Sequence, residues 1–451
     1  MERDRYTINY RRAEARQVMS WIDAGQSGCL VGLRGAGKSN FLRFLLREDV
    51  RHHYLARNCP DTVFVLVSFL ALTECSEWAV YELILDRLLD PVCRQCADEA
   101  RDLASCHRRI MRSRDPLAAR QALERCVGLL CRRPAQRVVL LLDEFDAVFG
   151  TLDPSLFRCL RAIRDAHKGQ VVYVVVVADE LIRLRDDLAQ VEHFLRLVNR
   201  NLCYLGPYCQ ADAQQMARYL ASQRSLELSP RDAARLVELS GGHAGLLKAT
   251  VSLLWSAGFE GNLAKLPPVL AGEPALQAEC RKVWDGLLED EQGALCALVS
   301  GVHADPAALG SLRRRGLVRE AGSQPPASSI FSPLFAGFVR RQTPPSMEGT
   351  VISRSPPVVQ IDGRPVGDLT ELEFELLCTL YERRGQVCTK DELIEHVYRQ
   401  RYDRMRGGVP DGTLQTLISR LRAKIEPDPG RPRYVLTVRG AGYKFVERDA
   451  A

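Results

Sequence analysis

The stretch LVGLRGAGKSNF, Leu30 to Phe41, determines how the amino-terminal part of this chain is expected to fold. Gly32, Gly37, Lys38 and Ser39 have the spacing G-x-x-x-x-G-K-[ST], with an apolar run before it and the amphipathic segment SNFLRFLLRE after it. A glycine loop between a strand and a helix presents backbone amides to a phosphate, and the lysine adds a positive charge. The sequence therefore predicts a triphosphate-binding loop that contacts ATP or ADP through Gly32, Gly35, Gly37, Lys38, Ser39 and Asn40.

Two further apolar runs end in acidic residues that can complete a nucleotide site. RVVLLLDEFD places Asp143 at the carboxyl end of a strand, where it and the Ser39 hydroxyl are candidate ligands of Mg²⁺. Glu144 is placed to orient or deprotonate the attacking water, while Lys38 stabilises the transferred phosphate. The next run, VVYVVVVADE, ends at Asp179, which either reads the γ-phosphate or only terminates the strand. The sequence favours neither role of Asp179.

Residues 27–208 alternate short, β-branched apolar runs with longer amphipathic segments. Runs that are apolar on both faces are typical of parallel strands covered by helices, so we expect an α/β domain with a parallel sheet. A charged helical insertion is expected at about 73–131, between the second and third strands. The predicted organisation is a P-loop ATPase domain at 1–208, a helical lid at 209–272, a middle winged-helix domain at 273–342, a linker at 343–357 and a carboxyl-terminal winged helix at 358–451.

The composition of the 451 residues, 46% hydrophobic and 26% charged, is typical of a globular protein. The apolar runs are much shorter than the ~20 residues that span a bilayer, so we expect no membrane contact and a cytoplasmic location. The 15 cysteines follow no disulfide spacing. Most are expected to be small buried hydrophobes, although Cys93, Cys96, Cys106 and His107 are an alternative zinc site.

The segment PDGTLQTLISRLRAKIE, near the carboxyl terminus, predicts a helix that faces DNA. Its leucines and isoleucines form one apolar stripe, while Thr416 and Ser419 lie opposite, with Gln415, Arg420 and Arg422 at the margins. Small hydrogen-bonding residues flanked by arginines suit a helix in a major groove, although an ordinary amphipathic surface helix would look similar. The later segment YVLTVRGAGYKFV predicts a hairpin that presents Thr437 and Arg439 to double-stranded DNA.

The amino-terminal motifs together resemble the P-loop signal-transduction ATPases with numerous domains, the STAND class, and the related AAA+ ATPases of the origin-recognition type. Over about residues 10–342 the resemblance also rests on the segments YRRAE, LGPY and SGGHAGLLKA. It implies that Arg12 lies beside the adenine, that Pro207 packs on the base and that His243 opens a helix near the phosphates. SGGHAGL lacks the arginine expected in AAA+ enzymes, which favours a slow switch over a motor; Lys248 comes one turn later.

Two arginines precede the fifth apolar run, NLCYLGPY. Arg196 and Arg200 are candidates for an arginine finger, which stabilises the phosphate during transfer. The alternative is that both side chains only solvate the end of a helix. Arg200 is the candidate that lies nearer the strand.

The segment 358–448 closely resembles the OmpR/PhoB-type winged-helix domain of response regulators, in which LISRLRAKI and TVRGAGYKF stand at the recognition helix and the wing. The resemblance implies DNA contacts by Arg420, Arg422 and Arg439. Ser419 replaces a basic residue that is common there, so the base preference does not transfer.

The combination predicts an ATP-dependent transcriptional regulator, in which an ATPase module replaces the receiver domain that usually controls such a DNA reader. We expect self-association on ATP binding, and contact with RNA polymerase or with an upstream signalling protein. Two other classes remain open from the sequence. One is an ATPase that assembles on DNA for replication or transposition-type loading, and the other is a STAND-type defence or signalling scaffold.

Overall fold

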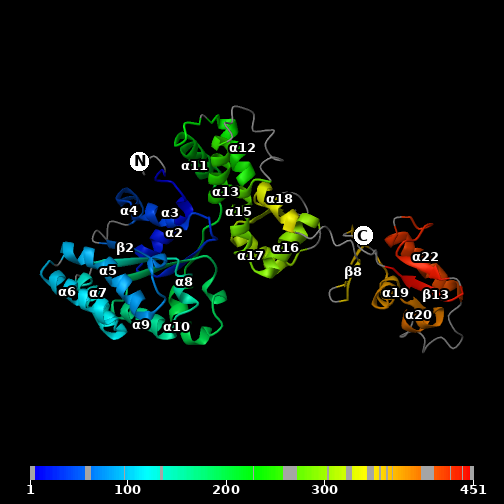
Figure 1. Cartoon of the computed structure of the whole chain (residues 1–451), viewed down its shortest axis with the longest axis horizontal. Coiled ribbons are helices and arrows are strands. Elements are labelled where there is room, and N and C mark those ends of the chain that lie inside the picture. The colour runs from blue at the N-terminus through cyan, green and yellow to red at the C-terminus, as the bar shows by residue number, and fades with distance from the viewer. Residues whose placement is uncertain are drawn as a thin grey trace. The chain divides into compact units, whose positions relative to one another are not determined.

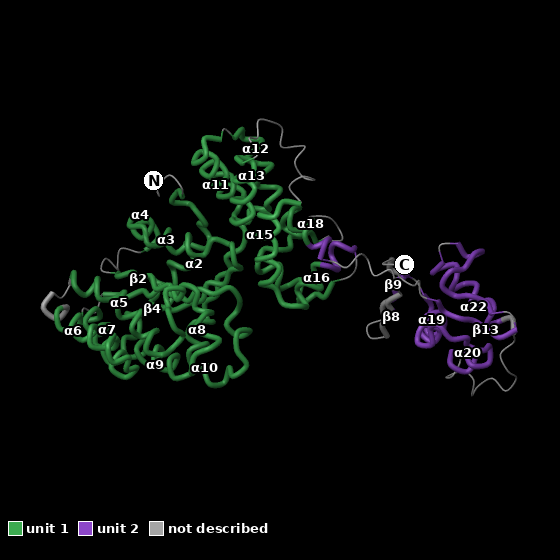
Figure 2. Tube along the Cα trace, in the orientation of Figure 1, with its two compact units in different colours: residues 1–295, 304–338 green, residues 296–303, 339–451 purple. Residues whose placement is uncertain are grey.

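The chain, seen in a computed structural model, forms two compact units (Figure 2). Unit 1 comprises residues 1–295 and 304–338, and unit 2 comprises residues 296–303 and 339–451. The structure describes residues 6–55, 62–95, 97–132, 136–226, 228–256, 272–301, 304–320, 328–342, 350–354, 357–361, 364–367, 369–397, 411–426, 428–438 and 440–446.

A five-stranded parallel sheet forms the centre of the amino-terminal domain (Figure 1), in the order β2-β3-β4-β1-β5. All residues of β1 and β4 are buried, because helices cover both faces of the sheet. This finding confirms the parallel α/β sheet predicted from the continuous apolar runs. The strands are β1 (Gly28–Val31), β2 (Thr62–Ser68), β3 (Arg137–Asp143), β4 (Val171–Val177) and β5 (Leu202–Tyr204).

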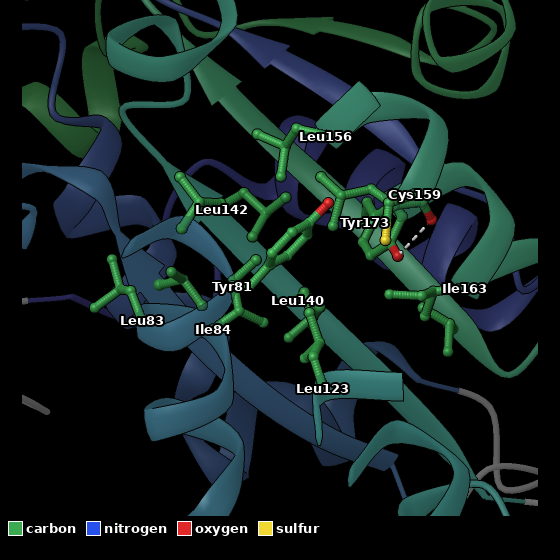
Figure 3. Packing of buried hydrophobic residues seen from close by; sticks show 14 of the residues in the cluster. Tyr81, Leu83, Ile84, Leu123, Leu140, Leu142, Leu156, Cys159, Ile163 and Tyr173 are labelled. Atoms are coloured by element: carbon green, nitrogen blue, oxygen red, sulfur yellow. Dashed lines mark hydrogen bonds between the residues drawn. The ribbon is translucent and has the colours of Figure 1, made fainter. Parts of the chain in front are cut away.

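Two hydrophobic cores lie on opposite faces of this sheet, because successive strand residues point to opposite sides. Leu140 belongs to the first core and Leu141 to the second. Figure 3 shows Tyr81 and Tyr173 among aliphatic side chains of the first core. The buried Tyr173 hydroxyl donates to Leu160 O at 2.8 Å, which satisfies its hydrogen-bonding capacity. Helices on the first face are α5 (Glu77–Gln95), α6 (Ala97–Ser113), α7 (Pro116–Leu130), α8 (Asp146–Phe149), α9 (Pro154–Ala166) and α10 (Leu188–Val198), and those on the second are α2 (Arg12–Asp23), α3 (Lys38–Leu46) and α4 (Glu48–Tyr54).

The insertion between β2 and β3 is helical, as predicted, and consists of α5, α6 and α7 after the short 3-10 helix η1 (Phe69–Ala71). The predicted zinc alternative is not assembled among the described residues of this insertion. His107 Nε2 lies 2.7 Å from Glu82 Oε1, Cys93 is exposed, and Cys96 lies outside the described residues. His107 thus groups with carboxylates in place of thiolates.

The lid and the middle winged helix follow the sheet. The helices α11 (Gln210–Ser222), α12 (Pro230–Ser240) and α13 (Ala244–Ser256) contact one another, and α13 contacts α15. Arg319 Nη2 donates to Gly241 O at 2.7 Å and Ser332 Oγ donates to Leu239 O at 2.7 Å, so the middle domain is bonded to the lid. The middle domain has the element order of a winged helix: α15 (Pro274–Trp284), α16 (Glu289–Ser300), α17 (Pro306–Arg314), β6 (Val318–Glu320), β7 (Ser328–Ile330) and α18 (Pro333–Gln342).

Unit 2 holds a second winged helix with its own core. Thr370 and Glu373 form a capping box at the start of the helix Glu371–Glu382, α19. Part of the predicted linker, residues 350–354, forms a strand that pairs antiparallel with β9. The elements are β8 (Thr350–Arg354), β9 (Pro357–Ile361), β10 (Arg364–Pro365), α19 (Glu371–Glu382), β11 (Val387–Cys388), α20 (Lys390–Val397), α22 (Asp411–Ile425), β12 (Val435–Val438) and β13 (Gly442–Phe445).

None of the helices in the described part of the chain has the length and apolar character needed to cross a bilayer. The longest helix of the insertion is α5, which contains several charged residues and a proline, Pro91.

Candidate nucleotide site and DNA-recognition surface

The predicted phosphate loop connects β1 to α3, and its shape depends on glycine. Gly35 and Gly37 have φ values of 82° and 89°, in the left-handed region that other residues rarely adopt. A Cβ on Gly35 would lie 3.0 Å from His243 Cε1. Lys38 Nζ donates to Gly32 O at 2.6 Å and to Leu33 O at 3.4 Å, so its ammonium lies over the loop. Burial lowers the pKa of Lys38, although nearby carboxylates oppose this shift.

Acidic side chains meet the loop at the carboxyl end of β3. Asp143 is buried, and its Oδ1 accepts the backbone N–H of Glu144 at 3.1 Å. Glu144 has a φ of 56°, an unusual value for a residue with a Cβ. Burial, followed by the charges of Asp143 and Asp146, raises the pKa of Glu144. A raised pKa makes this carboxylate a stronger base than an ordinary glutamate, as general-base catalysis requires.

A cavity of about 810 Å³ lies along the loop and the acidic edge. Glu144 Oε2 and Asp146 Oδ1 are buried and have no hydrogen-bond partner among the described residues. Unpaired polar atoms are costly to bury, so these two atoms fit a ligand such as a hydrated metal ion. Of the residues predicted to bind nucleotide or to act on it, the cavity is lined by Gly35, Gly37, Lys38, Ser39, Asn40 and Glu144.

The lid and the middle domain each supply a cavity residue that the sequence did not assign to the site. Lys248 on α13 and Lys282 on α15 line the cavity, and Lys282 Nζ lies 2.6 Å from Glu279 Oε1. Lys248 thus supplies a positive charge at the cavity, one turn after the position at which AAA+ enzymes are expected to have an arginine. Gly32, Pro207 and His243 line a small adjoining cavity, together with Arg315 of the middle domain.

The amino-terminal arginine that contacts the phosphate loop is Arg11, whereas the resemblance singled out its neighbour Arg12 as the residue beside the adenine. Arg12 is exposed in the first turn of α2, whereas Arg11 is buried. Arg11 Nη2 donates to Ala36 O at 3.0 Å and to Gly206 O at 2.8 Å, and its guanidinium lies 4.5 Å from the centre of the Tyr208 ring. The helix begins one residue later than Arg11, which has a left-handed φ of 46° and so turns its side chain inward.

His243 lies where the resemblance implied, immediately before α13 and beside the phosphate loop. Its Nδ1 accepts the backbone N–H of Leu246 at 3.4 Å, so the neutral ring carries its hydrogen on Nε2. Nε2 is buried and has no hydrogen-bond partner in the described part of the chain. Burial, and then the charge of Arg11, lowers the pKa of His243 to about 4. The ring is therefore neutral near pH 7 and offers one donor toward the loop.

We expect unit 1 to lose stability between pH 6.5 and about 4 because His243 resists protonation only when folded. The unfolded histidine takes up a proton near pH 6.5, so stability falls as the pH falls through this window, by about 2–3 kcal/mol. His243→Asn keeps an acceptor for Leu246 and cannot titrate. Urea unfolding across this window should show a smaller pH dependence for the variant, and parallel curves for the two proteins would refute the shifted pKa.

Asp179, at the end of β4, is bonded to the middle winged helix. Arg315 Nη2 donates to Asp179 Oδ1, and Arg315 is buried although it follows two exposed arginines. Glu291, also buried, lies 3.6 Å from Arg315 Nε and accepts from Ser311 Oγ at 2.6 Å. Arg183 joins the cluster, 3.6 Å from Asp179 and 3.2 Å from Glu291. Burial raises the pKa of Asp179, whereas Arg315 opposes this shift.

The two arginine-finger candidates lie away from the cavity. Arg196 is exposed and pairs with Glu192 on the same helix, with 2.6 Å between Nη2 and Oε1. Arg200 is exposed between α10 and the amino end of β5. The phosphate loop follows the carboxyl end of β1, whereas Arg200 precedes the amino end of β5. Because β1 and β5 are parallel, Arg200 and the loop lie at opposite ends of these strands. Neither side chain lines the nucleotide cavity of its own chain.

The carboxyl-terminal helix α22 has the face that the sequence predicted. Leu414, Leu417 and Leu421 are buried in the core of unit 2. The opposite face is exposed and carries four of the predicted DNA-contacting residues, Gln415, Thr416, Ser419 and Arg420. Arg439, at the predicted tip of the hairpin, lies outside the described residues.

Arg422 and Thr437, which were predicted to contact DNA, are hydrogen-bonded to each other within unit 2. Arg422 Nε and Nη2 donate to Val435 O at 3.0 and 2.6 Å, and Nη2 also donates to Thr437 Oγ1 at 2.8 Å. The guanidinium thus ties the recognition helix to the first strand of the wing. The helical periodicity of the sequence places Arg422 at the margin of the helix. It does not predict the bond to Val435, which is 13 positions away.

Comparison with known proteins finds a different family match in each of two parts of the chain. Residues 22–185 match the family model "AAA domain", and residues 363–445 match "Transcriptional regulatory protein, C terminal". The DNA-binding response regulator MtrA of Mycolicibacterium smegmatis is 46% identical over 78 residues, which are 17% of this chain and 31% of MtrA. The chain thus spans about a third of the length of the curated relatives that it matches.

Solved structures resemble each part. The ORC2 protein of Aeropyrum pernix is 13% identical, with 75% of this chain and 96% of that chain covered and a TM-score of 0.43. The DNA-binding domain of Klebsiella pneumoniae RstA is 28% identical, with 22% and 92% covered and a TM-score of 0.19. By its two family matches, the chain joins a nucleotide-binding P-loop domain of the AAA type to a carboxyl-terminal domain of the OmpR/PhoB-type transcriptional regulators.

Proposed function

We propose that this chain is a transcriptional regulator whose affinity for double-stranded DNA depends on the nucleotide in its P-loop domain. The observation that carries the proposal is the bond between Arg315 and Asp179. It joins the middle winged helix to the end of β4, and β4 is hydrogen-bonded to the phosphate loop through Gly32 N and Val177 O at 3.0 Å. The bond thus lies beside the edge where a third phosphate would add negative charge.

The residues at the loop support binding and slow hydrolysis of ATP. Backbone amides and Lys38 hold the phosphates, and Glu144 accepts a proton from the attacking water. Ser39 and Asp143 are the residues that would hold Mg²⁺, which neutralises charge on the phosphates when bound. His243 directs its Nε2–H toward the loop and reports on the bound nucleotide to the lid.

The switch requires ATP and ADP to stabilise the Arg315 contact differently. A shift from 1:99 to 99:1 between two states needs about 5.5 kcal/mol of differential binding. Charged hydrogen bonds contribute about 1.5–3 kcal/mol each, so two or three bonds made only to the γ-phosphate are sufficient. We infer that ADP favours the bonded arrangement of the middle domain and that ATP favours its release.

DNA recognition is assigned to α22 and the wing. Arg420, Gln415, Thr416 and Ser419 would face the major groove, and Arg439 would grip phosphate or a minor groove. One winged helix buries only about 600–1,000 Å² on DNA, so its affinity alone is modest. Self-association in the ATP state would raise avidity by about 10²–10⁴ through the higher effective concentration. Arg200 would then be available to complete the site of a neighbouring copy.

Replacing Lys38 by alanine is expected to weaken ATP binding about 100-fold, because two charged hydrogen bonds to phosphate oxygens are lost. Equilibrium binding of a fluorescent ATP analogue measures this change. Lys168→Ala, at an exposed turn before β4, is the matched control and should bind as the wild type does. Equal affinity of the Lys38 variant would refute the loop assignment.

Arg420→Ala is expected to weaken DNA binding about tenfold or more and to reduce its salt dependence, because one phosphate or base contact is lost. Its melting temperature should not change, since the side chain is exposed. Arg422→Ala should instead lower the melting temperature of unit 2, because it removes the bonds to Val435 and Thr437. Filter binding on a fragment selected from random DNA, together with thermal unfolding, separates the two effects.

Light scattering tests the proposed link to self-association. The particle mass should increase when ATP replaces ADP, and the increase should disappear in Lys38→Ala. A sequence-independent filament whose length follows the duplex would favour a DNA-loading ATPase over a regulator. Assembly with no effect of DNA would favour a signalling scaffold. Contacts with RNA polymerase or with an upstream protein are further expectations of the regulator.

A further inference from the structure

The outer edge of the parallel sheet is formed by β2, a strand without charged residues or proline. β2 is the last strand in the order, and it pairs only with β3 among the described residues. Its seven residues, TVFVLVS, include no charge and no proline. Proteins usually protect such an edge with charged residues, proline, a bulge or a covering element, because its backbone groups can pair with another chain. β2 has none of the protective residue types within the strand.

A groove of about 350 Å³ runs beside this edge, between α4 and α5. The arginines on its two sides are Arg51, Arg87 and Arg94. Arg51 stacks on Phe64 with 5.4 Å between the guanidinium carbon and the ring centre, and its buried Nε has no hydrogen-bond partner in the described part of the chain. The lining consists of residues 62–66 of β2, Arg51 of α4, and Arg87, Asp90, Pro91 and Arg94 of α5.

The groove has an excess of positive charge that is accessible to a partner. Arg94 pairs with Asp90, but both side chains are mostly exposed, at 75% and 69%, and such pairs contribute only about 0.2–1 kcal/mol. Arg87 is half exposed and lies 3.9 Å from Asp86. An incoming carboxylate can therefore replace these intrahelical partners at small cost.

We propose that this groove binds an extended, acidic segment of a partner protein, which adds to the sheet as a strand beside β2. Side chains alternate between the two faces of a strand, so one set would point toward Arg51 on α4 and the other toward Arg87 and Arg94 on α5. A second copy of the chain fits less well. Edge-to-edge pairing would place the arginines of both copies against one another, and like charges across a strand pair are destabilising.

The proposal is independent of the nucleotide and DNA sites, and its test uses neither ligand. The probe is a fluorescent peptide of alternating glutamate and valine, matched to the seven residues of β2. Its affinity for the full chain is measured by fluorescence anisotropy, and hydrogen exchange of the β2 amides reports where it binds. One comparison peptide carries lysine in place of glutamate, and the other carries an N-methyl group on every backbone amide.

The acidic peptide should bind and slow exchange in β2, whereas the lysine and N-methylated peptides should not. Arg87→Glu with Arg94→Glu should weaken binding about tenfold or more, because two attractions become repulsions. The matched control is Arg108→Glu with Arg112→Glu, two exposed arginines of α6 with the same change of charge. Equal binding by all three peptides, equal loss in both double variants, or a dimer of the chain that forms through β2 would overturn the proposal.

Discussion

Glu144→Gln is expected to reduce ATP hydrolysis about 10²–10⁴-fold while ATP stays bound, because the amide cannot accept a proton from the attacking water. Glu144 directly follows β3 and lines the cavity together with Lys38, and its buried Oε2 has no partner among the described residues. Burial and neighbouring carboxylates raise the pKa of Glu144, which brings it closer to the working pH of a base. Phosphate release gives the rate, and chromatography of the retained nucleotide shows whether ATP remains.

The matched control is Glu180→Gln, the same substitution at the end of the neighbouring strand. Glu180 accepts from the Tyr204 hydroxyl at 2.7 Å and does not line the nucleotide cavity. We expect this variant to hydrolyse ATP at the wild-type rate. If Glu144→Gln turned over ATP as fast as the wild type, Asp146 would become the candidate base, since its Oδ1 is also buried without a partner in the described part of the chain.

Arg315→Met is expected to lower the free energy of unfolding of unit 1 by about 3–5 kcal/mol, because it removes the buried cation shared by Asp179 and Glu291 and leaves Arg183, which is more exposed, as their remaining cation among the described residues. The Arg315 side chain is 3% exposed, and those of Asp179 and Glu291 are 16% and 1% exposed. Chemical denaturation measures the loss. The variant should also self-associate in ADP, since the bond that holds the middle domain is missing.

Two controls separate the lost bond from a general effect of the substitution. Arg314→Met removes an exposed neighbour, 4.0 Å from Glu180, and should change stability by less than about 0.5 kcal/mol. Asp179→Leu combined with Arg315→Met removes both charges and should recover part of the stability, because apolar pairs often replace buried ion pairs at little cost. A loss that is equal in both arginine variants would contradict the role given to Arg315.

The parts of the fold that depend on local pattern could be predicted from the sequence. The glycine and lysine spacing located the phosphate loop, because the loop needs positive φ at Gly35 and Gly37 within a few residues. Continuous apolar runs indicated strands that are buried on both faces. The apolar stripe of α22 and the capping box of Thr370 are likewise local, so both were recognisable before any tertiary contact was known.

The contacts on which the proposed switch depends are long-range, and no spacing rule predicts them. Arg315 and Asp179 are 136 positions apart, and Arg11 and Gly206 are 195 apart. Arg11 and Arg12 are adjacent and identical in type, so only the start of α2 decides which one turns inward. Three consecutive arginines end α17 and its cap, and their sequence does not reveal that Arg315 alone is buried among them. Likewise, no local pattern reveals that Arg422 bonds to Val435 whereas Arg420 is exposed.

The coupling between bound nucleotide and DNA affinity is tested most directly by gel shift. The full chain is titrated onto a DNA fragment selected from a random library, with ATP, with ADP and without nucleotide. Glu144→Gln holds the ATP state during the measurement, and Lys38→Ala holds the empty state. We predict binding about 10²–10⁴-fold tighter with ATP, together with a larger protein–DNA complex. Equal affinities and equal complex sizes in all three nucleotide states would contradict control of DNA binding by the P-loop domain.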